Sequence, residues 1–339
     1  MAPTSFSLSF MFLGTAGFVL LWGLMGINGT TGAMLNAAWT GKITGGPALK
    51  TRYTGIQSLD FALSILVAFF YGIMMEERPY LVILDIVGCV FVINMMTLVE
   101  SRRPTASKWL RFPLGWQYLF NGFGLAVFLP LYSYIFAMNK STTLPGRIPT
   151  PEAQSTPMTA LWSLLLPIPL LVPPILATSP ESVQNGLVLY FMTPLLFIIF
   201  HSTTCIFMSR GPSQCFKRPV QVSYQIVGIV STGIHLGILA FAFFSANPDL
   251  SIAHLYYPDN RMVQQGQPDA LMAGAYLFSQ WDLIITNITA LLLAISIDSG
   301  SSSVLIMIMV AAIGGPGAAL ALALIHQEDR LEKSRLRSD

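Results

Sequence analysis

Long apolar runs separated by short polar segments dominate the hydrophobic pattern of this chain. A helix that spans a bilayer needs about 20 consecutive, mostly apolar residues. The pattern predicts nine such helices, at residues 7–27, 56–75, 80–99, 116–137, 159–177, 185–208, 222–245, 271–295 and 303–325. The sequence therefore predicts an all-α, polytopic transmembrane bundle.

The fifth segment leaves an arrangement of eight spans open. It contains Pro167, Pro169, Pro173 and Pro174. Proline removes a backbone donor and kinks a helix, and a bilayer tolerates this only where neighbouring groups satisfy the freed carbonyls. With nine spans and the N-terminus outside, 12 of the 18 basic residues lie on the cytosolic side. This charge bias favours nine. The sequon Asn139-Lys140-Ser141 then lies on the non-cytosolic side, where glycosylation is possible.

Composition narrows the class of protein. Of the 339 residues, 53% are hydrophobic and only 10% are charged, whereas soluble domains carry about 25% charged residues. An ordinary soluble enzyme is therefore excluded. Lys and Arg exceed Asp and Glu by only 18 to 16, which argues against nucleic-acid binding by a basic face. We expect one transmembrane helical domain over residues 1–325, a charged C-terminal tail over 326–339, contact with membrane lipid, and residence in the endoplasmic reticulum.

Several chemical signatures are missing from the sequence. It contains no Asp-rich DDxxD or DxDD motif for a Mg²⁺-bound diphosphate, no Walker A or G-x-G-x-x-G loop, and no H-E-x-x-H. The four histidines show no metal-ligand spacing. We therefore predict neither a metal nor a cofactor.

Asp282 is the strongest candidate for a catalytic residue. It lies near the middle of the eighth predicted span, and Ser279, Asp282, Thr286 and Thr289 form one polar stripe at helical spacing. An ionisable group in hydrocarbon costs about 2.5–3.5 kcal/mol, which suggests a functional role. Burial favours the neutral acid, the form that a general acid needs. The alternative is a hydrogen bond between helices.

A second acidic group lies where the second and third predicted spans meet. Glu76 and Glu77 precede Arg78, and Asp85 lies about one turn into the third span. Two neighbouring carboxyl groups resist simultaneous ionisation, so Glu76, Glu77 and Asp85 are further candidate proton donors. The alternative for the glutamates is solvation beside Arg78.

Polar and aromatic residues on several spans could face one shared cavity. The candidates for substrate binding are Asp60, Tyr71, Asn121, Tyr132, His201, His235 and Trp281. For each histidine, an interhelical hydrogen bond is the alternative, and for Asp60 it is solvation at the interface. Aromatic residues make up 12% of the chain, and aromatic faces can stabilise a cation at close range.

The chain size, the intramembrane acids without a metal motif, and the segment MMEERPYLVILD resemble the fungal membrane-bound terpene cyclases of meroterpenoid pathways, especially the ascofuranone and macrophorin group. The resemblance implies a metal-free cyclase that protonates an epoxide or olefin on the farnesyl-type chain of a prenylated precursor and guides the carbocation. Asp282, Glu76, Glu77 and Asp85 are the positions that fit its proton donor.

Two other classes of function remain open at this point. Intramembrane acids and histidines also suit a proton-coupled transporter of a hydrophobic small molecule, although no internal repeat is evident. A receptor or scaffold for other enzymes is the third alternative. The sequence does not predict an oligomeric state.

Overall fold

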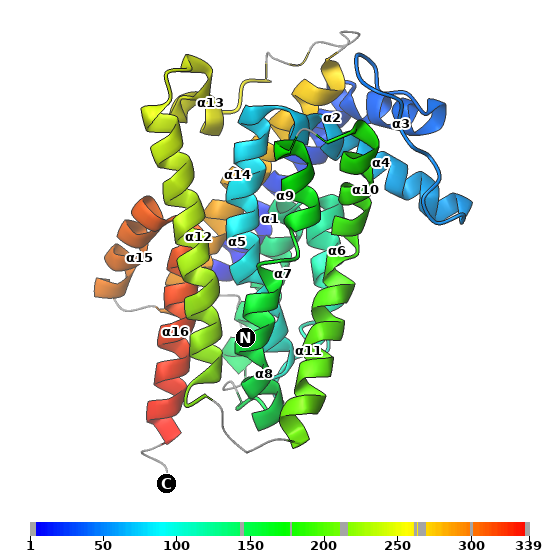
Figure 1. Ribbon diagram of the computed structural model, residues 1–339. Coiled ribbons are helices and arrows are strands. Elements are labelled where there is room, and N and C mark those ends of the chain that lie inside the picture. Colours follow the sequence, from blue (N-terminus) through cyan, green and yellow to red (C-terminus); the bar gives the residue numbers. More distant parts are fainter. Residues whose placement is uncertain are drawn as a thin grey trace.

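The computed structural model is a bundle of helices of very different lengths (Figure 1). It describes residues 5–142, 146–176, 178–210, 216–260, 263, 269–298 and 301–335, and within these ranges no β-strand forms. The elements are α1 (Ser5–Phe18), η1 (Val19–Gly23), α2 (Leu24–Ile27), α3 (Thr30–Thr40), α4 (Gln57–Met75), α5 (Glu77–Ser101), α6 (Pro113–Phe123), α7 (Leu125–Thr142), α8 (Thr150–Ser163), α9 (Ile168–Ile175), α10 (Pro180–Phe191), α11 (Thr193–Arg210), α12 (Pro219–Phe244), η2 (Pro248–Leu250), α13 (Ile252–Tyr256), α14 (Ala270–Ile297), α15 (Ser301–Gly314) and α16 (Pro316–Arg335).

The all-α prediction is confirmed, but the count of nine spans is not. Among the described residues, six helices are long and apolar enough to cross a membrane: Phe6–Ile27, Gln57–Met75, Glu77–Ser101, Thr150–Ile175, Pro219–Phe244 and Ala270–Ile297. The pair formed by Pro180–Phe191 and Thr193–Ser209 is bent by 49° and makes a seventh if it is one span. The proline-rich fifth segment is therefore part of a membrane-length helix.

The fourth predicted span, at 116–137, is two short helices. Gly124, with φ +94°, separates α6 from α7, and this left-handed conformation cannot continue a right-handed helix. Both outer ends lie at the same end of the bundle, because Ser107 N–H donates to Asn139 Oδ1 at 2.9 Å. With nine spans, the loop at 102–111 would lie on the cytosolic side and Asn139 on the other side. The contact with Ser107 places them at the same end of the bundle, so this expectation is wrong. Asn139 itself lies within helix α7.

The ninth predicted span, at 303–325, is also broken. Gly315, with φ +85°, separates α15 from α16. The segment after α14 and the second half of α16 meet, since Asp298 contacts His326 and Arg330. The second half of α16 therefore lies beside the point at which α15 starts, so α15 and α16 do not form one straight span. A hydropathy average cannot detect such a turn, because it sums apolar character and ignores backbone conformation. Helix α16 also continues unbroken through residues 325–326, where we expected the tail to begin.

Helix α5 forms the centre of the bundle (Figure 1). It is buried over 89% of its most apolar window, far more than the other long helices, and it packs against α4, α6, α12 and α16. A helix that is apolar on all sides is expected to be surrounded by other helices. Several apolar residues on one face of α5 line the cavity described next.

Candidate active site

A cavity of about 430 Å³ lies between α4, α5, α14 and the break between α6 and α7. This volume is in the range of small-molecule sites. Residues at helical spacing supply each wall. They are Ala62, Ile65, Leu66, Phe69 and Phe70 on α4; Ile83, Ile86, Val87 and Val90 on α5; and Phe278, Ser279 and Asp282 on α14. The lining is almost entirely apolar, as a hydrocarbon ligand requires.

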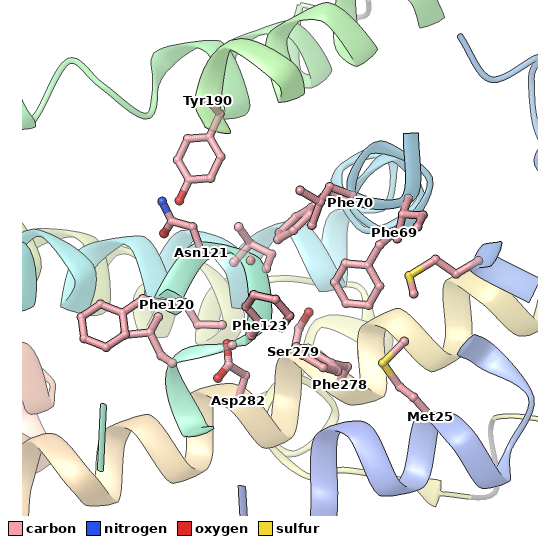
Figure 2. Close-up of a pocket in the computed structure, with 18 of the residues that line it drawn as sticks. Met25, Phe69, Phe70, Phe120, Asn121, Phe123, Tyr190, Phe278, Ser279 and Asp282 are labelled. Carbon is pink, nitrogen blue, oxygen red and sulfur yellow. The ribbon is translucent and has the colours of Figure 1, made fainter. Parts of the chain in front are cut away.

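Asp282 is the only carboxyl group among the described residues that line this cavity. It projects from α14 on the same face as Ser279 (Figure 2), and only 7% of its surface is exposed. Its Oδ1 accepts a hydrogen bond of 2.6 Å from the backbone N–H of Ala126. The first N–H groups of a helix carry a partial positive charge. The beginning of α7 therefore provides Asp282 with a partner for its charged form.

The break between α6 and α7 is satisfied from two sides. While Asp282 accepts from Ala126, the indole N–H of Trp22 donates to the Phe123 carbonyl at the end of α6, at 2.9 Å. Irregular backbone in an apolar interior is stable only when its polar groups are paired in this way. Gly124 is required at the break because of its positive φ and because a Cβ there would lie 2.7 Å from Leu21 Cδ2.

Aromatic rings surround the space beside Asp282. Phe278 packs edge-on against Phe69, with ring centroids 5.0 Å apart, and against Trp22 at 5.8 Å. Phe123 lies 6.1 Å from Trp22. In the Phe278–Phe69 and Phe278–Trp22 pairs the edge of one ring meets the face of the other. A ring face that borders the cavity can attract a cation within about 6 Å. The wall can therefore stabilise positive charge without supplying a nucleophile.

Among the predicted substrate-binding residues, Asn121 lines the cavity. It lies one turn before the helix break, and Figure 2 shows Tyr190 of α10 pointing toward it. Tyr132 lies behind α6 instead, fully buried and packed edge-on against Trp116 at 5.3 Å. Tyr71 is buried and Trp281 is half-buried, but neither is among the cavity-lining residues.

Asp85 and His235 form a separate polar contact. His235 Nδ1 lies 2.9 Å from Asp85 Oδ1, and the Tyr256 hydroxyl donates to Asp85 Oδ2 at 2.9 Å. This contact joins α5, α12 and α13. Asp85 is not a lining residue, whereas Ile83, Ile86 and Val87 are. The structure therefore supports the interhelical alternative for His235.

His201 and Asp60 are also engaged in local contacts. His201 is fully buried, with Nε2 2.8 Å from Glu152 Oε2 and Nδ1 3.0 Å from Thr159 Oγ1. Asp60 accepts backbone N–H bonds from Tyr53, Thr54 and Gly55, at 3.1, 2.6 and 3.0 Å. His201 thus joins α8 to α11, and Asp60 orders the loop that precedes α4. Neither lines the cavity.

Glu76 and Glu77 lie at the junction of α4 and α5 with exposed side chains. Arg78 lies over the Tyr276 ring, 5.7 Å from its centroid. The two glutamates thus lie where two helices meet, as predicted, but they are outside the cavity.

Sequence reasoning missed the backbone contribution to the site. Neither Gly124 nor the Ala126 N–H was a candidate, because an isolated glycine inside an apolar segment is tolerated in a helix and only weakly signals a break. It also missed Phe69, Phe123 and Phe278. The sequence pattern of an apolar helix face does not distinguish an aromatic residue that contacts lipid from one that packs in the core or contacts a ligand.

Comparisons with known proteins show which family and which proteins this chain resembles. A family model described as the CtvD domain matches residues 6–331. Terpene cyclase DEP1 of Fusarium langsethiae is 26% identical over 306 residues, which cover 84% of each chain. Terpene cyclase DEP1 of Alternaria brassicicola is 26% identical over 313 residues, covering 86% of this chain and 85% of its own.

Terpene cyclase sdgD of Emericella nidulans is 25% identical over 272 residues, covering 76% of this chain and 73% of its own. No solved structure matches the chain. Because the family model covers nearly the whole bundle, including every helix that lines the cavity, this chain belongs to the CtvD-domain family and is an enzyme of the terpene cyclase class.

Proposed function

We propose that this protein is a membrane-embedded, metal-independent cyclase that protonates an epoxide or olefin on the farnesyl-type chain of a meroterpenoid precursor. The observation that carries the proposal is the placement of Asp282, a lone carboxyl group in an apolar, aromatic cavity. Desolvation favours the neutral acid, and the substrate has no charged group that the cavity must match.

Asp282 is the proton donor in this mechanism. Because Oδ1 accepts the Ala126 N–H, the other carboxyl oxygen carries the transferable proton. Transfer to the epoxide oxygen or to an olefin carbon forms a carbocation and leaves a carboxylate. The start of α7 stabilises this carboxylate through the N–H and the helix dipole. The final cation loses a proton, which restores the acid, so the reaction is a net isomerisation.

Aromatic side chains guide the cation. Trp22, Phe69, Phe123 and Phe278 line the cavity, and their π-faces stabilise successive cationic centres without trapping them. The rigid helices that carry them fix the fold of the prenyl chain before protonation, which limits the number of products.

The long apolar helices support a location within a membrane, and we propose the endoplasmic reticulum. Large apolar side chains are exposed on several long helices, among them Phe12 at 72%, Ile229 at 71% and Phe243 at 74%. Side chains of this kind need lipid around them. A prenylated substrate would partition into the same bilayer, so lipid and substrate are the proposed partners.

Transport is not favoured as an alternative. The relatives reported above are named as cyclases. The histidines that suggested a proton relay join neighbouring helices, at Asp85 and at Glu152.

The test is to purify the Asp282→Asn variant and assay it with an epoxyfarnesyl phenol. Asparagine keeps the shape and can still accept the Ala126 N–H, but it cannot donate an acid proton. We expect turnover to fall by about 10²–10⁴-fold. Turnover within threefold of the wild type would rule out Asp282 as the donor.

Asp85→Asn is the matched control. Asp85 is as buried as Asp282, at 6% exposure against 7%, but it lies outside the cavity. We expect a much smaller loss there, and also for Glu76→Gln. A loss of turnover confined to Asp85→Asn or to Glu76→Gln would identify that residue, and not Asp282, as the proton donor. Addition of EDTA should leave the wild-type rate unchanged, and an EDTA-sensitive rate would contradict the metal-independent mechanism.

A further inference from the structure

A small polar recess lies beside the main cavity. It has a volume of about 20 Å³, and Val87, Val90, Asn121 and Tyr190 border both spaces. The remaining polar groups of the recess come from Asn94, Gln117, Ser163 and Thr193. Twenty cubic ångströms is enough for a single oxygen atom with its hydrogen. The recess is therefore a polar extension of an otherwise apolar site.

Gln117 is the unusual member of the recess. Its side chain is only 1% exposed, and neither Nε2 nor Oε1 has a hydrogen-bond partner within the described part of the chain. A buried polar group without a partner costs about 1–3 kcal/mol. The neighbouring hydroxyls are already used as donors, because Ser163 donates to the Ala160 carbonyl at 2.7 Å and Thr193 to the Tyr190 carbonyl at 2.6 Å.

The chemistry of Gln117 indicates what binds there. A primary amide offers donors at Nε2 and an acceptor at Oε1. A hydroxyl group both donates and accepts, so it can satisfy both atoms, whereas a carbonyl oxygen satisfies only the donor. An alkyl group satisfies neither and leaves the desolvation cost in place. The small volume excludes a larger polar group such as a carboxylate or phosphate.

We propose that Gln117 binds a hydroxyl group of the substrate and makes the enzyme selective for hydroxyl-bearing isoprenoids. This inference deepens the proposed cyclase function and rests on it. Gln117 and Asn121 lie one turn apart on α6, and the helix then leads to Gly124 beside Asp282. The seven residues from Gln117 to Gly124 advance about 10 Å along a helix. The hydroxyl contact thus holds one end of the substrate at a fixed distance from the acid.

The test compares an epoxyfarnesyl phenol with the same molecule lacking its hydroxyl group. We expect the wild type to prefer the phenol by about tenfold or more in kcat/KM, because a site built for a hydroxyl rejects the analogue that lacks it. Gln117→Met keeps the size of the side chain and removes both polar atoms. We expect it to bring the ratio close to one by weakening the phenol reaction. Gln117→Asn keeps the amide one methylene shorter and should give an intermediate ratio.

Gln327→Met is the matched control. Gln327 is similarly buried, at 3% exposure, but it contacts Glu100 and does not line the cavity. Its ratio should equal that of the wild type. Because each ratio is measured within one protein, a loss of folded enzyme cancels.

Two results would overturn the inference. One is a wild-type ratio near one, which would mean that the recess holds water or nothing. The other is an equal loss for both substrates in Gln117→Met, which would make Gln117 a packing residue. Binding of the two compounds without their epoxide, followed by tryptophan fluorescence, gives the same comparison without chemistry. If neither compound turns over but binding still discriminates, the cyclase proposal fails and the hydroxyl site stands.

Discussion

A carboxyl group buried among helices needs partners for its charged form, and the acids of this chain find different ones. Asp60 accepts three backbone N–H groups, Asp85 contacts His235 and Tyr256, and Asp298 contacts His326 and Arg330. Asp282 faces a cavity and accepts from Ala126. Acids that have an ionic partner or several hydrogen-bond partners stabilise the fold. A carboxyl group at a cavity wall can in contrast exchange a proton with a ligand.

Gly124 gives a prediction at this scale. Gly124→Ala should destabilise the protein by about 2–4 kcal/mol, because alanine is strained at φ +94° and its Cβ would overlap Leu21. Thermal unfolding in detergent measures the effect.

Gly122→Ala serves as the control for that experiment, since a Cβ at Gly122 meets no atom within 4 Å. It lies inside helix α6 and should raise stability slightly, as glycine-to-alanine changes in helices do. Equal unfolding temperatures for the two variants would contradict the role assigned to the break.

At the scale of elements, the predicted helices differ from the observed ones chiefly at two helix breaks, each at a glycine. The apolar segments at 80–99, 222–245 and 271–295 are continuous helices, and their apolar pattern was enough to predict them. The segments at 116–137 and 303–325 are also long and mostly apolar, but they turn back at Gly124 and Gly315. A glycine in an apolar run is compatible with a helix, so only tertiary contacts decide whether it takes a positive φ.

The end of α14 gives a prediction about pH. Burial alone would raise the pKa of the Asp298 carboxyl, but hydrogen bonds from His326 and Arg330 outweigh burial and hold this pKa below its ordinary value of 3.8. A lowered folded-state pKa contributes stability above pH 3.8 that is lost as the pH falls through the folded pKa. Asp298→Asn should therefore cost ~1–3 kcal/mol at pH 7, and much less at pH 3.

Unfolding of the wild type and Asp298→Asn between pH 7 and pH 3 measures this difference. Glu181→Gln is the comparison, because Glu181 is 70% exposed and pairs with Lys50 at 3.3 Å. Its effect should be small at every pH. A difference for Asp298→Asn that does not change with pH would show that the carboxylate contacts add no stability.

At the scale of the whole molecule, buried ion pairs join segments that are distant in sequence. Arg103, with a side chain 3% exposed, contacts Glu100 at 2.8 Å, Glu328 of α16, and the Gly146 carbonyl at 3.1 Å. Burial lowers the pKa of Arg103, but Glu100 and Glu328 outweigh burial and hold it above its usual value. The predicted tail after residue 325 is thus partly buried structure. Its charges suggested a solvated end, and nothing in its pattern shows which charges find buried partners.

Arg103→Met should destabilise the protein by about 3–5 kcal/mol, because it leaves Glu100 buried without its cation. Arg218→Met is the matched change at an exposed ion pair. Arg218 is 57% exposed and contacts Asp329 at 3.0 Å, so its loss should cost less than about 1 kcal/mol. Denaturant or thermal unfolding compares the two, and equal costs would contradict the structural role of the Arg103 network.

The partner of Asp282 is a main-chain N–H group, and this has a consequence for how such enzymes diversify. A substitution at Ala126 by any residue other than proline changes the side chain and leaves the backbone N–H in place, so Asp282 keeps a main-chain partner. The rings of Trp22, Phe69 and Phe278, in contrast, change shape with every substitution. The proton donation that we propose for Asp282 can therefore be kept unchanged while the cavity walls, which would shape the product, vary.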